Sequence, residues 1–389
     1  MLIHTFEAKV QVKKELYHAI AKELCGRSDW MRNGKEIIYF GYRFCGILVK
    51  LIMTGKEDYV RYDVVYRISP CRLFDPDDYL GLFDTAFTDK MIDELNFRLR
   101  VLCPLLPDAD MCELSRVDFT VNAVMENRKQ VKAYLDFIDR CRLPKHMKPK
   151  TRYDKVGKRH KKLADGFTVG TDKDKHNVEI SIYDKYRQME KENEKSRDPV
   201  FSERALTDGE NILRLEVRLM KHKVYALEKK YGVYSVRSFL KNADVIAPKI
   251  VEDYLTRMIP RETVRTLVGA RKIIAESAFD DEKKARLTAF VETVSVKRST
   301  QKAIDAYKAD GKQSEAKKCL KMLEKLDINC VVAKEKTMKI FEGYVPTPTE
   351  LWDKALSEYD GFKNVYVLRI GKRRKKKNGI YSLDKRAVM

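Results

Sequence analysis

The chain has 389 residues, room for roughly two or three domains with sizeable cores. Its 79 Lys and Arg outnumber 58 Asp and Glu, and the net charge of +21 favours a polyanionic partner, either a nucleic acid or an acidic membrane surface. No apolar run is long enough to span a bilayer, and the 8 cysteines form no C-x-x-C pair. We therefore expect a cytoplasmic protein without a membrane partner, a disulfide framework or a cysteine zinc site.

The N-terminal part of the chain is predicted to mix strands with helix. Residues 1–10 (MLIHTFEAKV) alternate as a strand does. Apolar-rich strands are expected at Glu36–Phe40, Tyr42–Ile52 and Glu57–Ile68, and these would form an antiparallel meander. A helix is expected over Thr88–Leu102, because prolines follow it directly.

Three later strands each carry charged side chains on one face, and the first of them is Ser115–Val124. Its polar row alternates with apolar residues and comprises Arg116, Asp118, Thr120 and Asn122. A helix is expected next, over Arg128–Arg142, packed on the back of the sheet. Residues 142–175 then hold twelve Lys or Arg against four Asp, with Pro and Gly between them. This composition is typical of loops and hairpins, and indicates either a solvated loop or a basic rim that contacts phosphates.

The second charged strand is Val178–Tyr183, which Phe167 and Val169 are expected to join as a hairpin. Its polar face holds Glu179, Ser181 and Tyr183, with Lys185 directly beyond the strand on the same face. The chain then becomes helical and highly charged. Tyr183 should therefore lie near the end of its strand, where a phosphate could reach it.

The third charged strand is Ile212–Leu219, in which Arg214, Glu216 and Arg218 alternate with apolar residues. Any one such row is equally well explained as a solvated surface with cross-strand ion pairs. Side by side, however, the three rows would combine carboxylates, a tyrosine and phosphate-binding cations. That combination suits phosphoryl transfer.

The three motifs RVDFTVN, ISIYDK and RLEVR, in this order, resemble the catalytic core of rolling-circle replication initiators. The resemblance is to the trans-acting Rep family of small bacterial plasmids, with a looser likeness to the gene II-type initiators of filamentous phages. It covers residues 112–223. The resemblance implies an α+β fold whose catalytic core is an antiparallel sheet with packed helices.

The resemblance also implies roles for individual residues. Tyr183 matches the family's nicking nucleophile, and Asp118 and Glu216 match its metal ligands. A carboxylate site prefers a hard ion, so the expected cofactor is Mg²⁺ or Mn²⁺. Asn122 stands where the family has a second Asp, which leaves the third metal ligand open; Glu179 and Glu113 are candidates.

The expected chemistry is metal-assisted transesterification, which leaves a 5′-phosphotyrosine and a free 3′-OH, a polarity that the resemblance implies. Lys185 is expected to lower the pKa of the phenol or to bind the phosphate. Arg116, Arg214 and Arg218 are expected to grip the DNA backbone, with ion pairing to the acids as the alternative. The chain has no G-x-x-x-x-G-K-[ST] loop, so helicase activity is not intrinsic, and a host helicase is a candidate partner.

Beyond Leu219 the pattern predicts helices almost throughout. They are expected at Tyr225–Tyr231, Val236–Leu240, Ile250–Met258, Glu262–Ala275, Asp281–Val294, Thr300–Tyr307 and Ser314–Leu326. Short helices with lysine-rich faces suit either a plain bundle or a helix-turn-helix or winged-helix reader of duplex DNA. A strand is expected at Asn364–Ile370, followed by a polybasic arm that contains Lys372, Arg373 and Arg374 and would attract DNA.

These patterns divide the chain into three parts. Residues 1–232 form the α+β nicking domain, 233–345 the helical DNA-binding region, and 346–389 a C-terminal extension with a basic tail. The expected partners are origin DNA, as duplex, hairpin or single strand, and a second copy of the chain as a homodimer. The rival hypothesis is a non-catalytic DNA-binding replication or copy-number regulator, and a more distant one is a structural RNA-binding protein.

Overall fold

The computed structural model describes residues 1–26, 30–33, 36–39, 45–56, 59–144, 147–149, 166–171, 178–196 and 199–359. The expected strand Asn364–Ile370, the cations Lys372, Arg373 and Arg374, and most of the basic 142–175 segment lie outside these residues. Within the described part, no helix is both long and apolar enough to cross a membrane.

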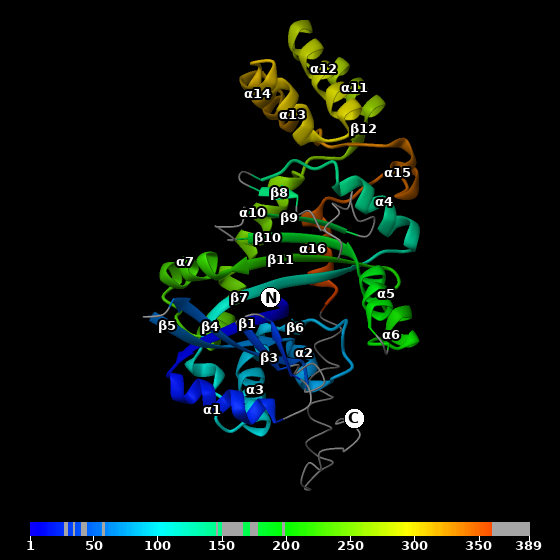
Figure 1. The fold of residues 1–389 in the computed structure, drawn as a ribbon. Helices are drawn as coiled ribbons and strands as arrows, with labels where there is room; N and C mark the ends of the chain where they lie inside the picture. The colour runs from blue at the N-terminus through cyan, green and yellow to red at the C-terminus, as the bar shows by residue number, and fades with distance from the viewer. Residues whose placement is uncertain are drawn as a thin grey trace.

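The centre of the molecule is one antiparallel sheet of eleven strands (Figure 1). Ten of them follow one another in the order β2 (Trp30–Asn33), β3 (Glu36–Tyr39), β4 (Ile47–Lys56), β5 (Tyr59–Ile68), β1 (Leu2–Val12), β7 (Glu113–Val124), β11 (Ile212–Met220), β10 (Val178–Asp184), β9 (Gly166–Thr171) and β8 (Met147–Pro149). The short strand β6 (Phe83–Asp84) pairs with the start of β1. With the many helices of the C-terminal half, this confirms the predicted α+β fold.

The sheet is built from two halves with the same order of elements. The N-terminal half-sheet is β1, β3, β4 and β5, with α1 (Lys14–Cys25) after its first strand. The C-terminal half-sheet is β7, β9, β10 and β11, with α4 (Arg128–Ile138) after its first strand. Their spatial orders, β3-β4-β5-β1 and β7-β11-β10-β9, mirror each other, and the two first strands pair at the seam. The predicted meander and the predicted hairpin before Tyr183 are both confirmed.

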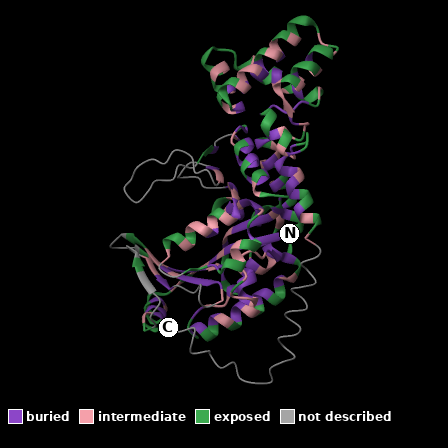
Figure 2. Ribbon diagram, turned by 90° about the vertical axis from the view of Figure 1, so that its right-hand side faces the viewer, coloured by how far each residue is buried: buried purple, intermediate pink, exposed green. Residues whose placement is uncertain are grey.

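Apolar side chains from both half-sheets enter one continuous core. Phe6, Val117, Phe119, Val121 and Leu215 are fully buried, as their alternation predicts. Their core also contains the buried residues of α1, α3 (Thr88–Leu102), α4 and α16 (Pro348–Ser357). Figure 2 shows the buried band running through the sheet and its neighbouring helices.

Shorter elements connect the sheet strands. They are α2 (Pro70–Phe74), the 3-10 turns Thr85–Phe87 and Ala109–Met111, α5 (Lys185–Lys195) and α6 (Glu203–Asp208). The strand predicted at Tyr42–Ile52 is placed wrongly: β4 begins at Ile47 and continues to Lys56. Cys45 and Gly46 both have positive φ, and a Cβ at Gly46 would stand 2.6 Å from the Cβ of Arg72. A turn that requires this glycine therefore precedes the strand.

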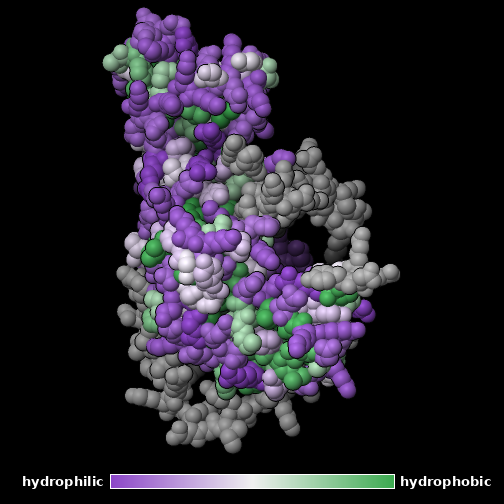
Figure 3. Space-filling model, turned by 90° about the vertical axis from the view of Figure 1, so that its left-hand side faces the viewer, coloured by the Kyte–Doolittle hydropathy of each residue, from purple (hydrophilic) through white to green (hydrophobic). Residues whose placement is uncertain are grey.

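The helices after β11 are α7 (Lys221–Tyr231), α8 (Val236–Lys241), α9 (Ala243–Ile246), α10 (Pro248–Met258), α11 (Leu267–Glu276), α12 (Asp281–Lys297), α13 (Thr300–Ala309), α14 (Gln313–Lys325), α15 (Glu335–Ile340) and α16. Helices α11–α14 form one end of the molecule, away from the sheet (Figure 1). Their surface is mainly hydrophilic (Figure 3). At their base, β12 (Arg265–Thr266) and β13 (Val332–Ala333) form a short parallel pair.

Several helix boundaries differ from prediction, among them the start of α7, which lies at Lys221 and not at Tyr225. At two others, tertiary contacts or a cap override the local pattern. The helix expected over Arg128–Arg142 ends at Ile138, and beyond it Arg140 donates to the Val332 carbonyl while the Arg142 amide donates to that of Met258. The helix expected from Glu262 begins only at Leu267, where the Thr266 side chain caps it. The three-part division of the chain stays a prediction, to which the structure adds that α16 packs against β7.

Candidate active site

The three motif strands lie side by side in the order β7, β11, β10. Glu216 stands opposite Thr120 on one side and Ser181 on the other, while Arg218 stands opposite both Asp118 and Glu179. Side chains directly opposite one another share a face of the sheet. The prediction that Asp118, Tyr183 and Glu216 project from the same face is therefore confirmed.

Tyr183 forms a hydrogen bond with the predicted acid. Its hydroxyl donates to Glu216 Oε1 over 2.7 Å, and its side chain is half-buried. Burial, followed by the Glu216 carboxylate, raises the pKa of Tyr183 well above its ordinary value, and Arg214 opposes this. The neighbouring strand is glycine at this point because a Cβ at Gly166 would stand 2.7 Å from the Cβ of Tyr183.

Asp118 is buried between two arginines. Arg116 donates to it from Nε at 2.8 Å, and Arg218 Nε donates at 3.0 Å. Burial alone would raise the pKa of Asp118, but the hydrogen bonds and charges of the two guanidinium groups outweigh it and hold that pKa below its usual value. The carboxylate is therefore ionised at neutral pH.

Arg218 faces three carboxylates at once. Besides the bond from Nε to Asp118, its Nη1 donates to Glu179 Oε1 at 2.5 Å and its Nη2 lies 3.6 Å from Glu216 Oε2. The three acids come from the three adjacent strands, β7, β10 and β11. The predicted alternative of ion pairing to the acids is thus what Arg116 and Arg218 do in this structure.

Arg214 is anchored inside the protein. Its Nε donates to Asn122 Oδ1 at 2.7 Å and its Nη2 to the Leu80 carbonyl at 2.9 Å, and the side chain is fully buried. The third nitrogen, Nη1, is buried without a hydrogen-bond partner among the described residues. Arg214 lies directly opposite Tyr183 on the neighbouring strand. Asn122 therefore positions this arginine.

Lys185 lies at the start of α5 and not on a continued strand. It is buried and donates from Nζ to Gln188 Oε1 at 2.7 Å. Burial and the Arg214 charge lower its pKa well below the ordinary lysine value, with Glu192 and Glu216 opposing. The charges of both Arg214 and Glu216 therefore act on the lysine.

His4 belongs to the same site, and sequence reasoning missed it. Its Nδ1 lies 3.8 Å from Glu216 Oε1, the oxygen that accepts the Tyr183 hydroxyl. Burial and four nearby cations lower its pKa well below 6.5, so the ring is neutral. The pairing of β1 with β7 is irregular between Ile3 and Thr5, which breaks the alternation that would have indicated the direction of His4.

The donor set fits a hard divalent ion in chemistry. Asp118, Glu179 and Glu216 supply carboxylate oxygens, the ligands that Mg²⁺ and Mn²⁺ prefer. Among the described residues, however, no three His, Cys, Asp or Glu side chains are arranged as a metal site. Glu113, the other candidate acid, is exposed at the start of β7. Any ion would therefore have to displace the guanidinium groups that now bind these acids.

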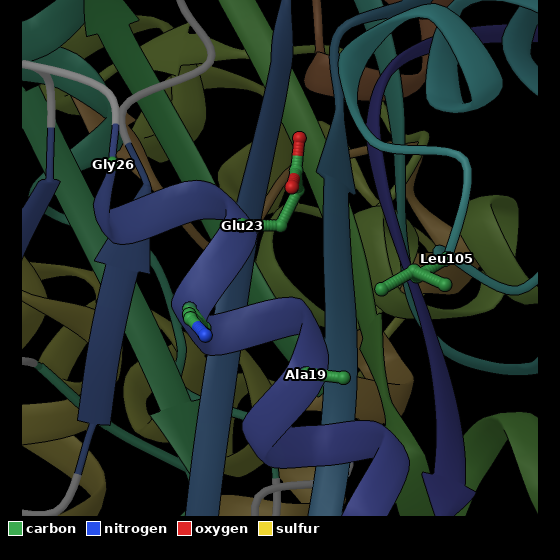
Figure 4. A pocket seen from close by; sticks show the side chains of 5 residues that line it. Ala19, Glu23, Gly26 and Leu105 are labelled. Atoms are coloured by element: carbon green, nitrogen blue, oxygen red, sulfur yellow. The ribbon is translucent and has the colours of Figure 1, made fainter.

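A hollow elsewhere on the surface has no comparable chemistry. It lies between the end of α1 and the segment after α3, lined by Ala19, Lys22, Glu23, Gly26 and Leu105 (Figure 4). It contains no tyrosine and a single carboxylate. The motif strands remain the candidate site.

The solved structures that match this chain include two of low sequence identity. One is a rolling circle replication initiator protein from Geobacillus stearothermophilus, 12% identical, covering 66% of this chain and 84% of that chain with a TM-score of 0.30. The other is the di-domain ARO/CYC StfQ from the steffimycin biosynthetic pathway, 11% identical, covering 65% and 96% with a TM-score of 0.19. TM-scores this low carry no argument about fold or function. No curated protein matches the chain significantly.

A family match covers the candidate site. Residues 47–239, about half of the chain, match a phage family described as the N-terminal part of a replication-associated protein of the gene II type. The matched range contains β7, β10 and β11, and with them Asp118, Tyr183 and Glu216. The motifs resembled the plasmid Rep family more closely than the phage gene II-type initiators. The family match is nevertheless to the gene II type. The match of residues 47–239 to this family of phage replication-associated proteins confirms the recognition of the chain as a gene II-like relative of rolling-circle replication initiators.

Proposed function

We propose that this protein nicks one DNA strand at a replication origin and becomes covalently attached to it, which starts rolling-circle replication. A role in rolling-circle replication follows from the family; the nick, the nucleophile and the metal are the proposal. The observation that carries it is the hydrogen bond from the Tyr183 hydroxyl to Glu216, on the same sheet face as Asp118. A nucleophile paired to a base beside positively charged groups is the arrangement that covalent phosphoryl transfer requires.

In the proposed reaction, the Tyr183 oxygen attacks the scissile phosphorus. A Tyr–O–P bond forms, the bond from phosphorus to the 3′ oxygen breaks, and that oxygen takes up a proton to become a 3′-OH. Glu216 Oε1 already accepts the phenol hydrogen, so it is the natural acceptor of the proton that Tyr183 loses. Mg²⁺ or Mn²⁺, held by Asp118 and Glu216, would neutralise charge on the phosphate.

The raised pKa of Tyr183 changes the role expected for the neighbouring cations. Burial keeps the phenol protonated at neutral pH, so the proton must leave during the attack. Arg214 is the cation that lowers this pKa, and its unpartnered Nη1 is a donor for negative charge that develops on the opposite strand. Lys185, whose pKa burial and the Arg214 charge lower, is proposed to bind the phosphate. Arg116 and Arg218 can contact the DNA backbone only if their hydrogen bonds to Asp118 and Glu179 break.

DNA binding outside the sheet is proposed for the helical end of the molecule. In α14, Ala316, Cys319 and Leu323 are buried while Lys317, Lys318, Lys321 and Lys325 are exposed. A row of exposed lysines neutralises duplex phosphates without reading sequence. A host helicase and a second copy of this chain remain proposed partners.

The test is covalent capture. Full-length protein is incubated with Mn²⁺ and a labelled single-stranded oligonucleotide from its own origin region, then denatured. The wild type should leave a labelled protein–DNA adduct, Tyr183→Phe should leave none, and the nearby control Tyr186→Phe should behave as wild type. An adduct that persists in Tyr183→Phe would move the nucleophile elsewhere, and no adduct from any protein would favour the non-catalytic regulator.

A further inference from the structure

Arg218 stands at the centre of a carboxylate cluster made of Asp118, Glu179 and Glu216. Each of its three guanidinium nitrogens faces a different acid, at 3.0 Å from Asp118, 2.5 Å from Glu179 and 3.6 Å from Glu216. One side chain thus balances carboxylates from three neighbouring strands. These are the same oxygens that a divalent ion would need.

The acids are buried more deeply than the arginine. The side chains of Asp118 and Glu216 are 2% and 6% exposed, whereas that of Arg218 is 22% exposed. The acids project from paired strands, but the arginine ends a long flexible side chain that reaches solvent. Arg218 can therefore withdraw while the carboxylates stay in place.

We propose that Arg218 is an internal cation of this cluster, and that a divalent ion binds there only in competition with its guanidinium. The inference rests on the metal part of the proposed function. The guanidinium and a divalent ion compete for the same carboxylate oxygens, and the repulsion between the two cations opposes simultaneous binding. Arg218 thereby holds the acids together in the metal-free protein and sets the metal concentration at which the ion replaces it.

Removing the arginine should have a distinctive effect on metal binding. In Arg218→Gln the bonds from Arg116 to Asp118 and from Tyr183 to Glu216 remain, but the cluster loses the positive charge that all three acids share. The added net negative charge then favours a divalent ion. We expect Arg218→Gln to bind Mn²⁺ about tenfold or more tightly than the wild type at the same pH and ionic strength.

A matched control lies on the same face of the N-terminal half-sheet. Arg61 Nε lies 2.8 Å from Asp63 Oδ1, and the Arg61 side chain is 34% exposed. Arg61→Gln removes a comparable guanidinium from a carboxylate that has no recorded contact with the cluster, so its Mn²⁺ affinity should equal that of the wild type. Titration calorimetry and Mn²⁺ electron paramagnetic resonance on full-length protein without DNA measure both affinities directly.

Equal or weaker Mn²⁺ binding by Arg218→Gln than by the wild type would overturn the proposal. If this variant unfolds in EDTA, recovery of its fold by Mn²⁺ supports the proposal, and failure to recover contradicts it. Arg218→Lys keeps a positive charge but has fewer directed hydrogen-bond donors, so it should bind Mn²⁺ with intermediate affinity.

Covalent capture by Tyr183 is measured separately. If the wild type forms the adduct but Arg218→Gln binds Mn²⁺ no more tightly than the wild type, only the role of Arg218 is refuted. If the wild type forms the adduct in EDTA, the metal part of the proposed function is refuted as well.

Discussion

In the described residues the two half-sheets share an order of strands and a charged face, but the residues proposed for chemistry lie mainly on the C-terminal one. On the N-terminal half-sheet, Lys9 pairs with Asp63 at 2.8 Å and Arg67 with Glu7 at 2.5 Å. On the C-terminal half-sheet, similar pairs surround a tyrosine whose hydroxyl reaches Glu216. Alternating charges on adjacent strands therefore produce an ion-paired surface by themselves. The tyrosine beside the acid is what distinguishes the candidate site.

The charged face is continuous across the seam between the halves. Arg116 bonds Asp118 on its own strand, and its Nη1 lies 3.7 Å from Glu7 of β1. His4 also crosses the seam, toward Glu216. The N-terminal half-sheet thus contributes His4 and Glu7 to the charged face around the candidate site.

The largest expected difference between the halves is in the covalent reaction. Glu216→Gln removes the group that accepts the phenol hydrogen, so the rate of adduct formation should fall by roughly 10²–10⁴-fold. Glu7→Gln makes the same change on the N-terminal half-sheet and should leave the rate close to wild type. Single-turnover capture on a labelled oligonucleotide measures both. Similar losses in the two variants would show that the whole charged face acts as one unit.

A second difference concerns what covers each half. The C-terminal half-sheet depends on the far end of the chain, since α16 packs against β7 and its Trp352 is buried. Trp352→Ala should lower the free energy of unfolding by about 3–5 kcal/mol, because it leaves a large cavity in the core. Urea denaturation followed by far-ultraviolet circular dichroism checks this value. A loss below about 1 kcal/mol, the level of an ordinary surface change, would mean that α16 is dispensable to the sheet.

The same substitution of a tyrosine should have opposite consequences in the two halves. Tyr66 of β5 is buried and donates to the Pro107 carbonyl at 2.8 Å, so Tyr66→Phe should cost about 1 kcal/mol of stability and retain adduct formation. Tyr183→Phe should lose the adduct completely at a stability cost of about 1–3 kcal/mol, since its partner is a charged acid. Paired denaturation and capture measurements separate the two effects. Loss of the adduct in folded Tyr66→Phe would contradict the assignment.

The smallest effect is expected at an ionic link between the regions. Arg237 of α8 donates to Asp89 and Asp93 of α3 and to Asp110. The hydrogen bond from Arg237 lowers the pKa of Asp110 in the folded protein. The stability that this bond contributes is therefore fully present above the pKa of Asp110 in the unfolded chain, about 4. It is lost as the pH falls through the lower pKa of the folded protein. Solvent screens the cluster, so Arg237→Ala should cost at most about 1 kcal/mol near pH 7.

The measurement for this link is stability against pH and salt. The difference between wild type and Arg237→Ala should shrink in acid and at high ionic strength. A difference that persists unchanged in molar salt would indicate that packing of the Arg237 side chain, and not its charge, stabilises the link.

The sequence by itself determined the three motif strands and the composition of each of their faces, but not helices such as α1, α15 and α16. Strict alternation in Ser115–Val124, Val178–Tyr183 and Ile212–Leu219 places apolar side chains on one side and charges on the other, because a strand has a period of two. The three motifs also indicated the family before any contact was known. Local pattern misplaced three boundaries. The turn at Cys45–Gly46 delays the start of β4, and the Thr266 cap delays the start of α11. Helix α4 ends early at Ile138, beyond which Arg140 and Arg142 form hydrogen bonds with distant carbonyls.

Only the tertiary structure decided which polar side chains meet. The order β1-β7-β11-β10 sets the neighbours, and the register places Arg218 between Asp118 and Glu179 and Arg214 opposite Tyr183. His4 reaches Glu216 only through the irregular pairing of β1 with β7. Pairing partners and register depend on contacts between residues far apart in the chain, and a bulge changes the direction of a side chain without changing the sequence pattern. Alternation can therefore assign a face to each residue, but the partner of each charge follows from the assembled sheet.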